Sequence, residues 1–546
     1  MRTESRKTLA LVLAGTVTLA VAGTARAEGC DATDREWQRF VVADAALGAG
    51  GEARVLRTFG IGGRTFHAVA VPAGAAEGFA RAAARGGFVE ADACRRAVRT
   101  GDDPHFAGAG LWGQDFDNQW AIRRAGFEPA NGDTWPDPAT LAPVTVAVID
   151  SGIDWYHPDL PGGALWRNDR EVPGNGTDDD GNGYADDLIG WNFIDNHAKP
   201  WDEDGHGTFV AGVIAAGRGN GTGIAGINPA ARIMVLKALD AFGRGHASMV
   251  AEAIAYAADN GARVVNLSLG GRTLTRIEQA AVDHAVARGA VVVVAAGNDG
   301  EEVAGHSPAG LEGVITVTAT DRADRRAGFS NWGPAIDIAA PGVDVLSLRA
   351  RRTDLLSLIP GVKYEAGAGI VGEDRAYFRA SGTSFAAPIV SGTLSLIMAR
   401  DPTVTAAQAR RMVLHSARDI ETPGVDNYTG YGLIDAAAAV TASPDYYLES
   451  RISGVQVAKQ GGKSVLRVLG TADADRFGKA TILLGQGAEP AKWLRVNVAI
   501  GKPVADGTLM DLPAALFKGP KTWTIRLVTE HATGAKREAR FKLTLG

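Results

Sequence analysis

The stretch that decides the fold is "SGTSFAAPIVSG", residues 381–392. Small residues surround a serine, Ser384, and an apolar run begins beside it. Proline is tolerated in the first turn of a helix and rarely deeper, so Pro388 predicts a helix that begins almost at Ser384. A serine at a helix start is either a cap or a nucleophile whose developing oxyanion would lie against the helix N-terminus. The choice depends on whether the chain also supplies a base, an orienting carboxylate and a second oxyanion donor.

Strands and helices alternate around this stretch, from about Pro143 to Val440. Runs such as "VTVAVID", "RIMVLKAL" and "VVVVAAG" are short, apolar and rich in β-branched residues. Helix-like segments such as "ASMVAEAIAYAADNG" lie between them and end at glycine. This alternation predicts an α/β fold with a doubly wound, mostly parallel sheet that is covered on both faces. Ligand chemistry in such folds lies beyond the carboxyl ends of the strands.

Three further residues stand where such chemistry is expected. Asp150 closes the strand "VTVAVID", His206 opens a small-residue helix in "DEDGHGTFVAG", and Asn298 follows "VVVVAAG". Taken singly, they could be a cap, a solvated loop residue and a turn former. Together with Ser384 they supply the nucleophile, the base, the carboxylate and the oxyanion donors of acyl transfer, the last from the Asn298 amide and the Ser384 backbone N–H.

Six blocks in order carry a family resemblance. The stretches "VAVIDSGIDWYHPDL", "DGHGTFVAG", "VVNLSLGG", "AAGNDG", "FSNWGPAIDIAAPG" and "SGTSFAAP" resemble the signature blocks of subtilisin-like serine peptidases. The resemblance covers about residues 110–440 and implies a serine endopeptidase. It also implies that Asp150, His206 and Ser384 form the catalytic triad and that Asn298 is an oxyanion donor.

The same resemblance implies how a polypeptide substrate binds. An extended edge would pair with the substrate backbone, and a second segment would line the primary specificity pocket. The edge residues are Ser268, Leu269 and Gly270, and the pocket residues are Ala295, Ala296 and Gly297. Asp299 should stand near the pocket rim, where it could favour a basic side chain.

Two rival functions were weighed against this one. A sedolisin-like carboxyl-serine peptidase would need glutamate in place of His206 and aspartate in place of Asn298, which excludes it. A catalytically silent member of the fold that acts as a binding module should have lost at least one of the four chemical residues, and all four are present.

The chain departs from the family pattern near these residues. Phe209, Phe385 and Ile389 stand where the family usually has histidine, methionine and histidine. None belongs to the triad, so we expect altered packing around the site and retained chemistry. The stretch of residues 349–378 is longer than the short loop that the family often has there, and it could overhang the substrate cleft.

The sequence predicts four regions. Residues 1–27 have the basic start, apolar stretch and Ala-Arg-Ala ending of a secretory signal peptide, so export to the periplasm or the medium is expected. Residues 28–103 form a small α+β unit that resembles the family's inhibitory propeptide, which would act as an intramolecular inhibitor. Residues 104–442 are the catalytic domain. Residues 443–546 alternate apolar and polar residues and predict an all-β sandwich.

Composition limits the other partners. The formal charge is −6 and no Lys/Arg block occurs, so nucleic-acid binding is not expected. No segment after the signal is long enough to span a membrane, and a monomer is expected. The chain has two cysteines, Cys30 and Cys94, which could form one disulfide after export; metal ligation by the two thiols is a weaker alternative.

The acidic stretch "GNGTDDDGNGYADD" predicts a structural Ca²⁺ site. Oxygen ligands at alternate positions of a glycine turn suit this ion, as in an EF-hand loop. The twelfth place is Ile189 and not glutamate, so Asp187 is the candidate substitute, and a solvated acidic turn is the alternative. The candidate ligands are Asp178, Asp180, Asn182, Tyr184, Asp186 and Asp187.

Overall fold

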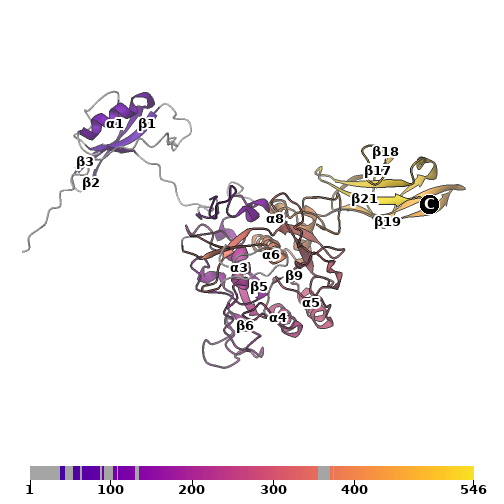
Figure 1. The fold of residues 1–546 in the computed structure, drawn as a ribbon, viewed down its shortest axis with the longest axis horizontal. Coiled ribbons are helices and arrows are strands. Elements are labelled where there is room, and N and C mark those ends of the chain that lie inside the picture. Colours follow the sequence, from indigo (N-terminus) through magenta and orange to yellow (C-terminus); the bar gives the residue numbers. More distant parts are fainter. Residues whose placement is uncertain are drawn as a thin grey trace, which may run out of the picture. The chain divides into compact units, whose positions relative to one another are not determined.

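A computed structural model of the chain describes residues 37–43, 53–61, 64–85, 89–91, 103–106, 108–128, 135–353, 369–372 and 374–545. The chain forms two compact units, Met1–Ala97 and Val98–Gly546 (Figure 1). The predicted signal peptide and both cysteines lie outside the described residues. Within the described ranges, no helix is long and apolar enough to cross a bilayer.

The larger unit is built on a parallel sheet that has seven strands in the described part of the chain. β5 lies inside the sheet, with β7 on one side and β8 on the other, so the chain winds outward in both directions from it. This is the doubly wound α/β fold that the alternating pattern predicts. Across the sheet the strands are β11 (Ile338–Pro341), β10 (Ile315–Thr320), β9 (Val291–Ala295), β8 (Val264–Leu267), β5 (Val144–Asp150), β7 (Ala231–Lys237) and β6 (Gly190–Asn192).

Helices cover both faces of this sheet (Figure 1). Alternate side chains of β5 enter different cores: Val146 and Val148 pack with α3 and α6, and Ala147 and Ile149 pack with α4 and α5. The strand is therefore apolar along its whole length. The helices are α2 (Trp120–Arg124), α3 (His206–Ala215), α4 (Ala247–Asp259), α5 (Arg276–Ala287), α6 (Thr383–Arg400), α7 (Ala406–Ser416) and α8 (Ala436–Thr441).

The smaller unit is an antiparallel sheet with one helix in the residues that are described. Its strands lie in the order β2 (Arg54–Ile61), β3 (Arg64–Pro72), β1 (Trp37–Ala43) and β4 (Val89–Ala91), and α1 spans Ala76–Arg85. The stretches "ARVLRTFGI", "RTFHAVAVP" and "GFVEADACRRAV" predict the strands β2, β3 and β4, and "AAEGFARAAARGG" predicts the helix α1, whereas β1 was not predicted. β2 and β3 pair up to Ile61 and Arg64, while the Gly62-Gly63 turn predicted between them lies outside the described residues.

Two antiparallel sheets follow residue 447 and share one core. Five of their strands are predicted by the stretches "SVLRVLGTA", "KATILLGQG", "WLRVNVAI", "TWTIRLVTEH" and "EARFKLTLG", while two more, β15 and β19, are not. One sheet is β15 (Leu448–Gln460), β16 (Lys463–Ala474) and β19 (Val504–Pro513). The other is β18 (Trp493–Ile500), β17 (Phe477–Gln486), β20 (Thr522–His531) and β21 (Lys536–Thr544).

An arginine joins this β region to the catalytic part of the same unit. Arg537 of β21 is buried, and its guanidinium donates to the carbonyls of His415 (3.1 Å) and Tyr431 (3.2 Å). The Tyr431 ring lies 4.9 Å from the same guanidinium. Because the last carbonyls of a helix have no intrahelical donor, Arg537 completes the C-terminal end of α7.

The long stretch of residues 349–378 is only partly a loop. β14 (Tyr377–Ala380) pairs on one side with β12 (Val345–Leu348) and on the other with β13 (Ile370–Val371). Near its start, Arg351 donates to both carboxylate oxygens of the buried Asp154, at 2.9 and 3.2 Å. Residues 354–368 lie outside the described residues, so the predicted overhang of the cleft stays a prediction.

Candidate active site

Asp150 and His206 meet at the carboxyl end of β5. Asp150 is fully buried, and its carboxylate accepts hydrogen bonds from the Ser151 N–H (2.7 Å) and from His206 Nδ1 (2.8 Å to Oδ1). Burial alone would lower the pKa of His206, but the Asp150 carboxylate, with Asp204 and Asp202 nearby, raises it to about 9. The arrangement holds the proton on Nδ1 and leaves Nε2 for chemistry.

The start of α3 is held by an aspartate that the sequence analysis did not single out. His206 is the first residue of α3, and the preceding Gly205 has φ 107° and no side chain to cap the helix. Asp202 does this instead: Oδ1 accepts from the Gly205 N–H (2.7 Å) and Oδ2 from the Thr208 N–H (2.9 Å). Its Oδ1 also accepts from the Ser151 hydroxyl at 2.8 Å, which ties the helix to the residue after Asp150.

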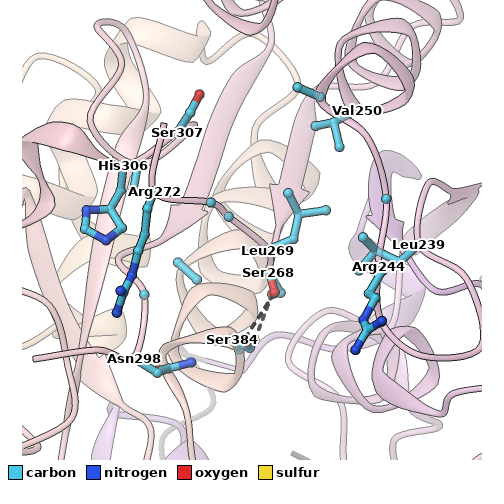
Figure 2. A pocket seen from close by; sticks show the side chains of 18 of the residues that line it. Leu239, Arg244, Val250, Ser268, Leu269, Arg272, Asn298, His306, Ser307 and Ser384 are labelled. Atoms are coloured by element: carbon cyan, nitrogen blue, oxygen red, sulfur yellow. Dashed lines mark hydrogen bonds between the residues drawn. The ribbon is translucent and has the colours of Figure 1, made fainter. Parts of the chain in front are cut away.

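Ser384 is the second residue of α6, which begins one residue earlier than expected, at Thr383. Pro388 therefore lies beyond the first turn. Because proline has no N–H, the Ser384 carbonyl lacks its partner within the helix. The Ser268 hydroxyl donates to that carbonyl at 2.8 Å, and the Ser384 hydroxyl donates to the Ser268 carbonyl at 3.1 Å (Figure 2).

Asn298 lies beside Ser384 just beyond the end of β9 (Figure 2). Its Oδ1 accepts hydrogen bonds from the Thr383 N–H (2.9 Å) and the Thr383 hydroxyl (3.0 Å). Two donors on one side fix the orientation of the amide. The Nδ2 donor is therefore left for the groove that Asn298 and Ser384 both line.

A buried asparagine supports the segment that carries Asn298. Asn331 donates through Nδ2 to the Ala296 carbonyl (3.0 Å) and accepts through Oδ1 from the Asp299 N–H (3.0 Å). Gly297 has φ 100°, and a Cβ there would lie 2.4 Å from Asn331 Nδ2. The sequence analysis missed this residue, although Asn331 stands inside the quoted block "FSNWGP".

These side chains open onto one groove with a volume of about 840 Å³. Asp150 lies behind His206 and does not line it. The groove brings together the other residues that the sequence placed in catalysis and substrate binding: His206, Ser268, Leu269, Gly270, Ala295, Ala296, Gly297, Asn298 and Ser384.

Two of the departures from the family pattern touch each other. The rings of Phe209 and Phe385 have centroids 4.3 Å apart, and Phe385 also lies 5.5 Å from the His206 ring. Phe209, Phe385 and Ile389 are all fully or almost fully buried. The aromatic pair therefore packs behind the imidazole.

Three carboxylates form the acidic group that could hold a metal ion. Asp178, Asp180 and Glu171 each offer an oxygen, and these atoms lie within 4.8 Å of one another. Such an all-oxygen donor set fits Ca²⁺. Glu171 was missed because it precedes the EF-hand-like stretch; in space, its Oε1 accepts the Asp179 N–H at 2.9 Å.

The other candidate ligands have different partners. Asp186 accepts the N–H groups of Gly174 (2.6 Å) and Gly176 (2.9 Å). Asp187 is buried and accepts from the Tyr256 hydroxyl (2.5 Å) and from Asn182 Nδ2 (2.8 Å). The Tyr184 hydroxyl donates to Glu252. Asp186 and Asp187 therefore lie outside the group formed by the three carboxylates, while the assignments of Asn182 and Tyr184 as ligands stay predictions.

Comparison with known proteins gives a consistent set of relatives. The "Thermophilic serine proteinase" of Bacillus sp. (strain AK1) is 38% identical over 296 residues, which is 54% of this chain and 61% of that protein. "Thermitase" of Thermoactinomyces vulgaris is 35% identical over 295 residues, 54% of this chain and 88% of that protein. The "Cell wall-associated protease" of Bacillus subtilis (strain 168) is 31% identical over 379 residues, 63% of this chain and 37% of that protein.

The extent of these matches differs between the relatives. The chain spans less than two thirds of the thermophilic serine proteinase and of the cell wall-associated protease. The sequence profile of the Subtilase family (Peptidase_S8) matches residues 142–432, more than half of the chain. That range contains Asp150, His206, Asn298 and Ser384, and with the parallel sheet on which they lie it shows that the chain belongs to the subtilase family.

Proposed function

We propose that the protein is an exported serine endopeptidase that hydrolyses peptide bonds in polypeptides. The observation that carries this proposal is that His206, Ser384 and Asn298 line one groove and that Asp150 is hydrogen-bonded to His206 behind it. Asp150 ends β5 and Asn298 follows β9, while His206 opens α3 and Ser384 lies in the first turn of α6. Relatives named serine proteinase and thermitase support the same activity.

In the proposed reaction, Ser384 attacks the scissile carbonyl carbon. Its Oγ proton passes to His206 Nε2, while the Nδ1–H stays on the Asp150 side of the ring. Because the hydroxyl donates to the Ser268 carbonyl in this structure, it must give up that hydrogen bond before it transfers its proton. Such hydrogen bonds commonly tighten only when substrate is bound.

The negative charge that develops on the substrate oxygen would meet two donors. One is Asn298 Nδ2, whose direction is set by the Thr383 donors to Oδ1. The other is the Ser384 backbone N–H, which lies in the first turn of α6 where N–H groups have no intrahelical partner. Collapse of this intermediate breaks the C–N bond, and Nε2–H protonates the leaving amine. Water then hydrolyses the acyl-enzyme by the same steps.

The substrate would lie along the groove. Residues 268–270 would pair with its backbone as an added strand, and residues 295–297 would line the pocket for the side chain before the scissile bond. We further propose that Glu171, Asp178 and Asp180 hold a structural Ca²⁺, which would reduce the repulsion among their charges.

The remaining parts of the proposal concern processing. Residues 1–27 would direct export to the periplasm or the medium, residues 28–103 would inhibit the catalytic domain of residues 104–442 until they are removed, and residues 443–546 would stay attached. The mature protein would act as a monomer. Relatives named extracellular and cell wall-associated proteases support export.

Intact mass and N-terminal sequencing of the exported protein test the proposal, with Ser384→Ala as the matched variant. We expect the wild type to be trimmed between about Cys94 and Asp115 and the variant to keep its propeptide. If both are trimmed alike, a fluorophosphonate probe of the serine decides whether the protein is active. If neither is trimmed and the probe does not label Ser384, the protein is a silent binding module and the proposal is wrong.

A further inference from the structure

The groove contains ionisable side chains that the proposed mechanism does not use. Glu278, His306 and Ser307, called here the polar cluster, all line it. Ser307 and Gly271 exchange two backbone hydrogen bonds, from the Gly271 N–H to the Ser307 carbonyl (2.8 Å) and from the Ser307 N–H to the Gly271 carbonyl (2.9 Å). These bonds attach the cluster to the end of the substrate-binding edge. Figure 2 shows His306 and Ser307 on the Asn298 side of the groove, away from Leu239 and Arg244. The cluster therefore belongs to the primary pocket.

His306 is a buried imidazole without a hydrogen-bond partner. Its residue surface is 8% exposed, and neither ring nitrogen makes a hydrogen bond within the described part of the chain. The Asp299 carboxylate oxygen is 3.9 Å from Nε2, too far for a hydrogen bond. A buried polar group without a hydrogen bond raises the free energy of the folded protein. A ligand that enters the groove and hydrogen-bonds to this imidazole would recover that free energy.

Glu278 brings a buried negative charge to the same place. It is 4% exposed, and its Oε2 accepts the Ser307 hydroxyl (2.6 Å) and the Thr275 hydroxyl. Among the residues that the structure describes, no hydrogen bond reaches its Oε1 and no cation pairs with it. The two hydroxyls bind only one oxygen of this buried carboxylate, so a cation at the other oxygen would balance its charge.

The rim of the pocket does not supply that partner. Arg272 reaches from the end of the substrate-binding edge to Asp299 (2.7 Å) and Glu301 (3.2 Å) on the opposite wall. Asp299 is thus already paired, so the basic preference suggested for it from the sequence cannot rest on Asp299 alone. The Arg272 side chain is 61% exposed, and an exposed ion pair of this kind is weak. Of the described residues on this side of the groove, Glu278 is a buried carboxylate that has no cationic partner.

We propose that the pocket selects lysine or arginine as the residue immediately before the scissile bond. The cationic head would donate to Glu278 Oε1 and to the unprotonated ring nitrogen of His306. An aliphatic side chain would fill the pocket but leave both groups unpaired, and a carboxylate would be repelled by Glu278. A site built to hydrogen-bond its ligand discriminates strongly against analogues that lack the donors. The inference rests on the proposed endopeptidase activity.

Four chromogenic peptide amides that differ only in this residue (Lys, Arg, Leu or Glu) test the inference on the mature enzyme. We expect kcat/KM for Lys or Arg to exceed that for Leu by about tenfold or more, the effect of one hydrogen bond to a charged group. Glu278→Gln keeps an acceptor for the Thr275 and Ser307 hydroxyls and removes the charge. It should lower the Lys-to-Leu ratio by about tenfold.

The ratio of two substrates in one preparation does not depend on how much of the variant folds. Glu302→Gln is the matched control, because Glu302 is exposed and lies outside the groove lining; its Lys-to-Leu ratio should equal that of the wild type. If Glu278→Gln yields no active enzyme, the kcat/KM values of the wild type for the four substrates decide whether the inference holds. A preference for Leu or Glu in the wild type overturns the inference and leaves the endopeptidase proposal standing. No hydrolysis of any substrate, together with no probe labelling of Ser384, overturns both.

Discussion

Replacing Ser268 with alanine should destabilise the catalytic domain, and replacing Pro388 should relieve part of that loss. The Ser268 hydroxyl donates to the Ser384 carbonyl at 2.8 Å and accepts from Asn266 Nδ2 at 2.9 Å. Ser268 and Asn266 are buried, so alanine leaves a buried acceptor and a buried donor unpaired. At about 1.5 kcal/mol for each, Ser268→Ala should lower the free energy of unfolding by about 3 kcal/mol.

The Ser384 carbonyl needs Ser268 only because residue 388 has no N–H. In Pro388→Ala the new backbone N–H can donate to the Ser384 carbonyl, as at any interior helix position. In that background Ser268→Ala should lower the free energy of unfolding by about 1.5 kcal/mol, because only the Asn266 donor then loses its partner. The coupling free energy between the two substitutions should therefore be about 1.5 kcal/mol.

Urea unfolding of the four proteins measures this coupling. All four should carry Ser384→Ala, which prevents self-digestion, and linear extrapolation gives the free energies. Ser395→Ala is the control: this buried serine of the same helix bonds to Gly392 and Asn228, so its cost should be the same with either residue at 388. A coupling below about 0.5 kcal/mol would refute the reasoning, because independent sites add to within that limit.

Three further outcomes are expected. The pKa of His206 is raised to about 9 and its neutral form is the base, so kcat/KM should rise with pH, with a midpoint above the usual imidazole pKa of about 6.5. Asp150→Asn should move this midpoint to lower pH and reduce kcat about 10⁴-fold. An unchanged midpoint in the variant contradicts the assignment of the raised pKa to Asp150. Gly297→Ala, at φ 100° and against Asn331, should lower the free energy of unfolding by about 1–3 kcal/mol, measured by urea unfolding. Chelation of Ca²⁺ with EGTA should lower the thermal unfolding midpoint of the wild type, and the decrease should be smaller in Glu171→Gln. An equal decrease in both proteins would show that Glu171 is not a Ca²⁺ ligand.

The sequence predicted the sheet, and it singled out the candidate catalytic groups that the structure brings to one groove, because both depend on local patterns. Apolar strands such as β5 are recognisable at any position, and Asp150 and Asn298 follow from the rule that chemistry lies at the carboxyl ends of strands. The partners that complete the site do not follow from such rules. Asp202 caps a helix from outside it, and Ser268 bonds a carbonyl 116 residues away, so only the folded arrangement reveals their roles.

Errors elsewhere have similar causes. The acidic loop was interpreted by EF-hand spacing, which treats ligands as neighbours in the chain; Glu171 comes from an earlier turn and was missed. β15 and β19 were missed because exposed and half-buried residues interrupt their alternation, and only pairing with β16 identifies them as strands. Glu278 was not singled out from the sequence, because its partner Ser307 lies 29 residues further along the chain.

The guanidinium of Arg537 makes the end of α7 dependent on the order of synthesis. The carbonyl of His415 accepts a hydrogen bond from a residue that lies 122 positions further along the chain. Ribosomes add about 5–20 residues per second, so this donor is made about 6 to 24 s after the helix that needs it. During that interval α7 has exposed terminal carbonyls, and a chain interrupted before β21 retains them permanently. Completion of this helix thus reports that the β region has been synthesised and has folded.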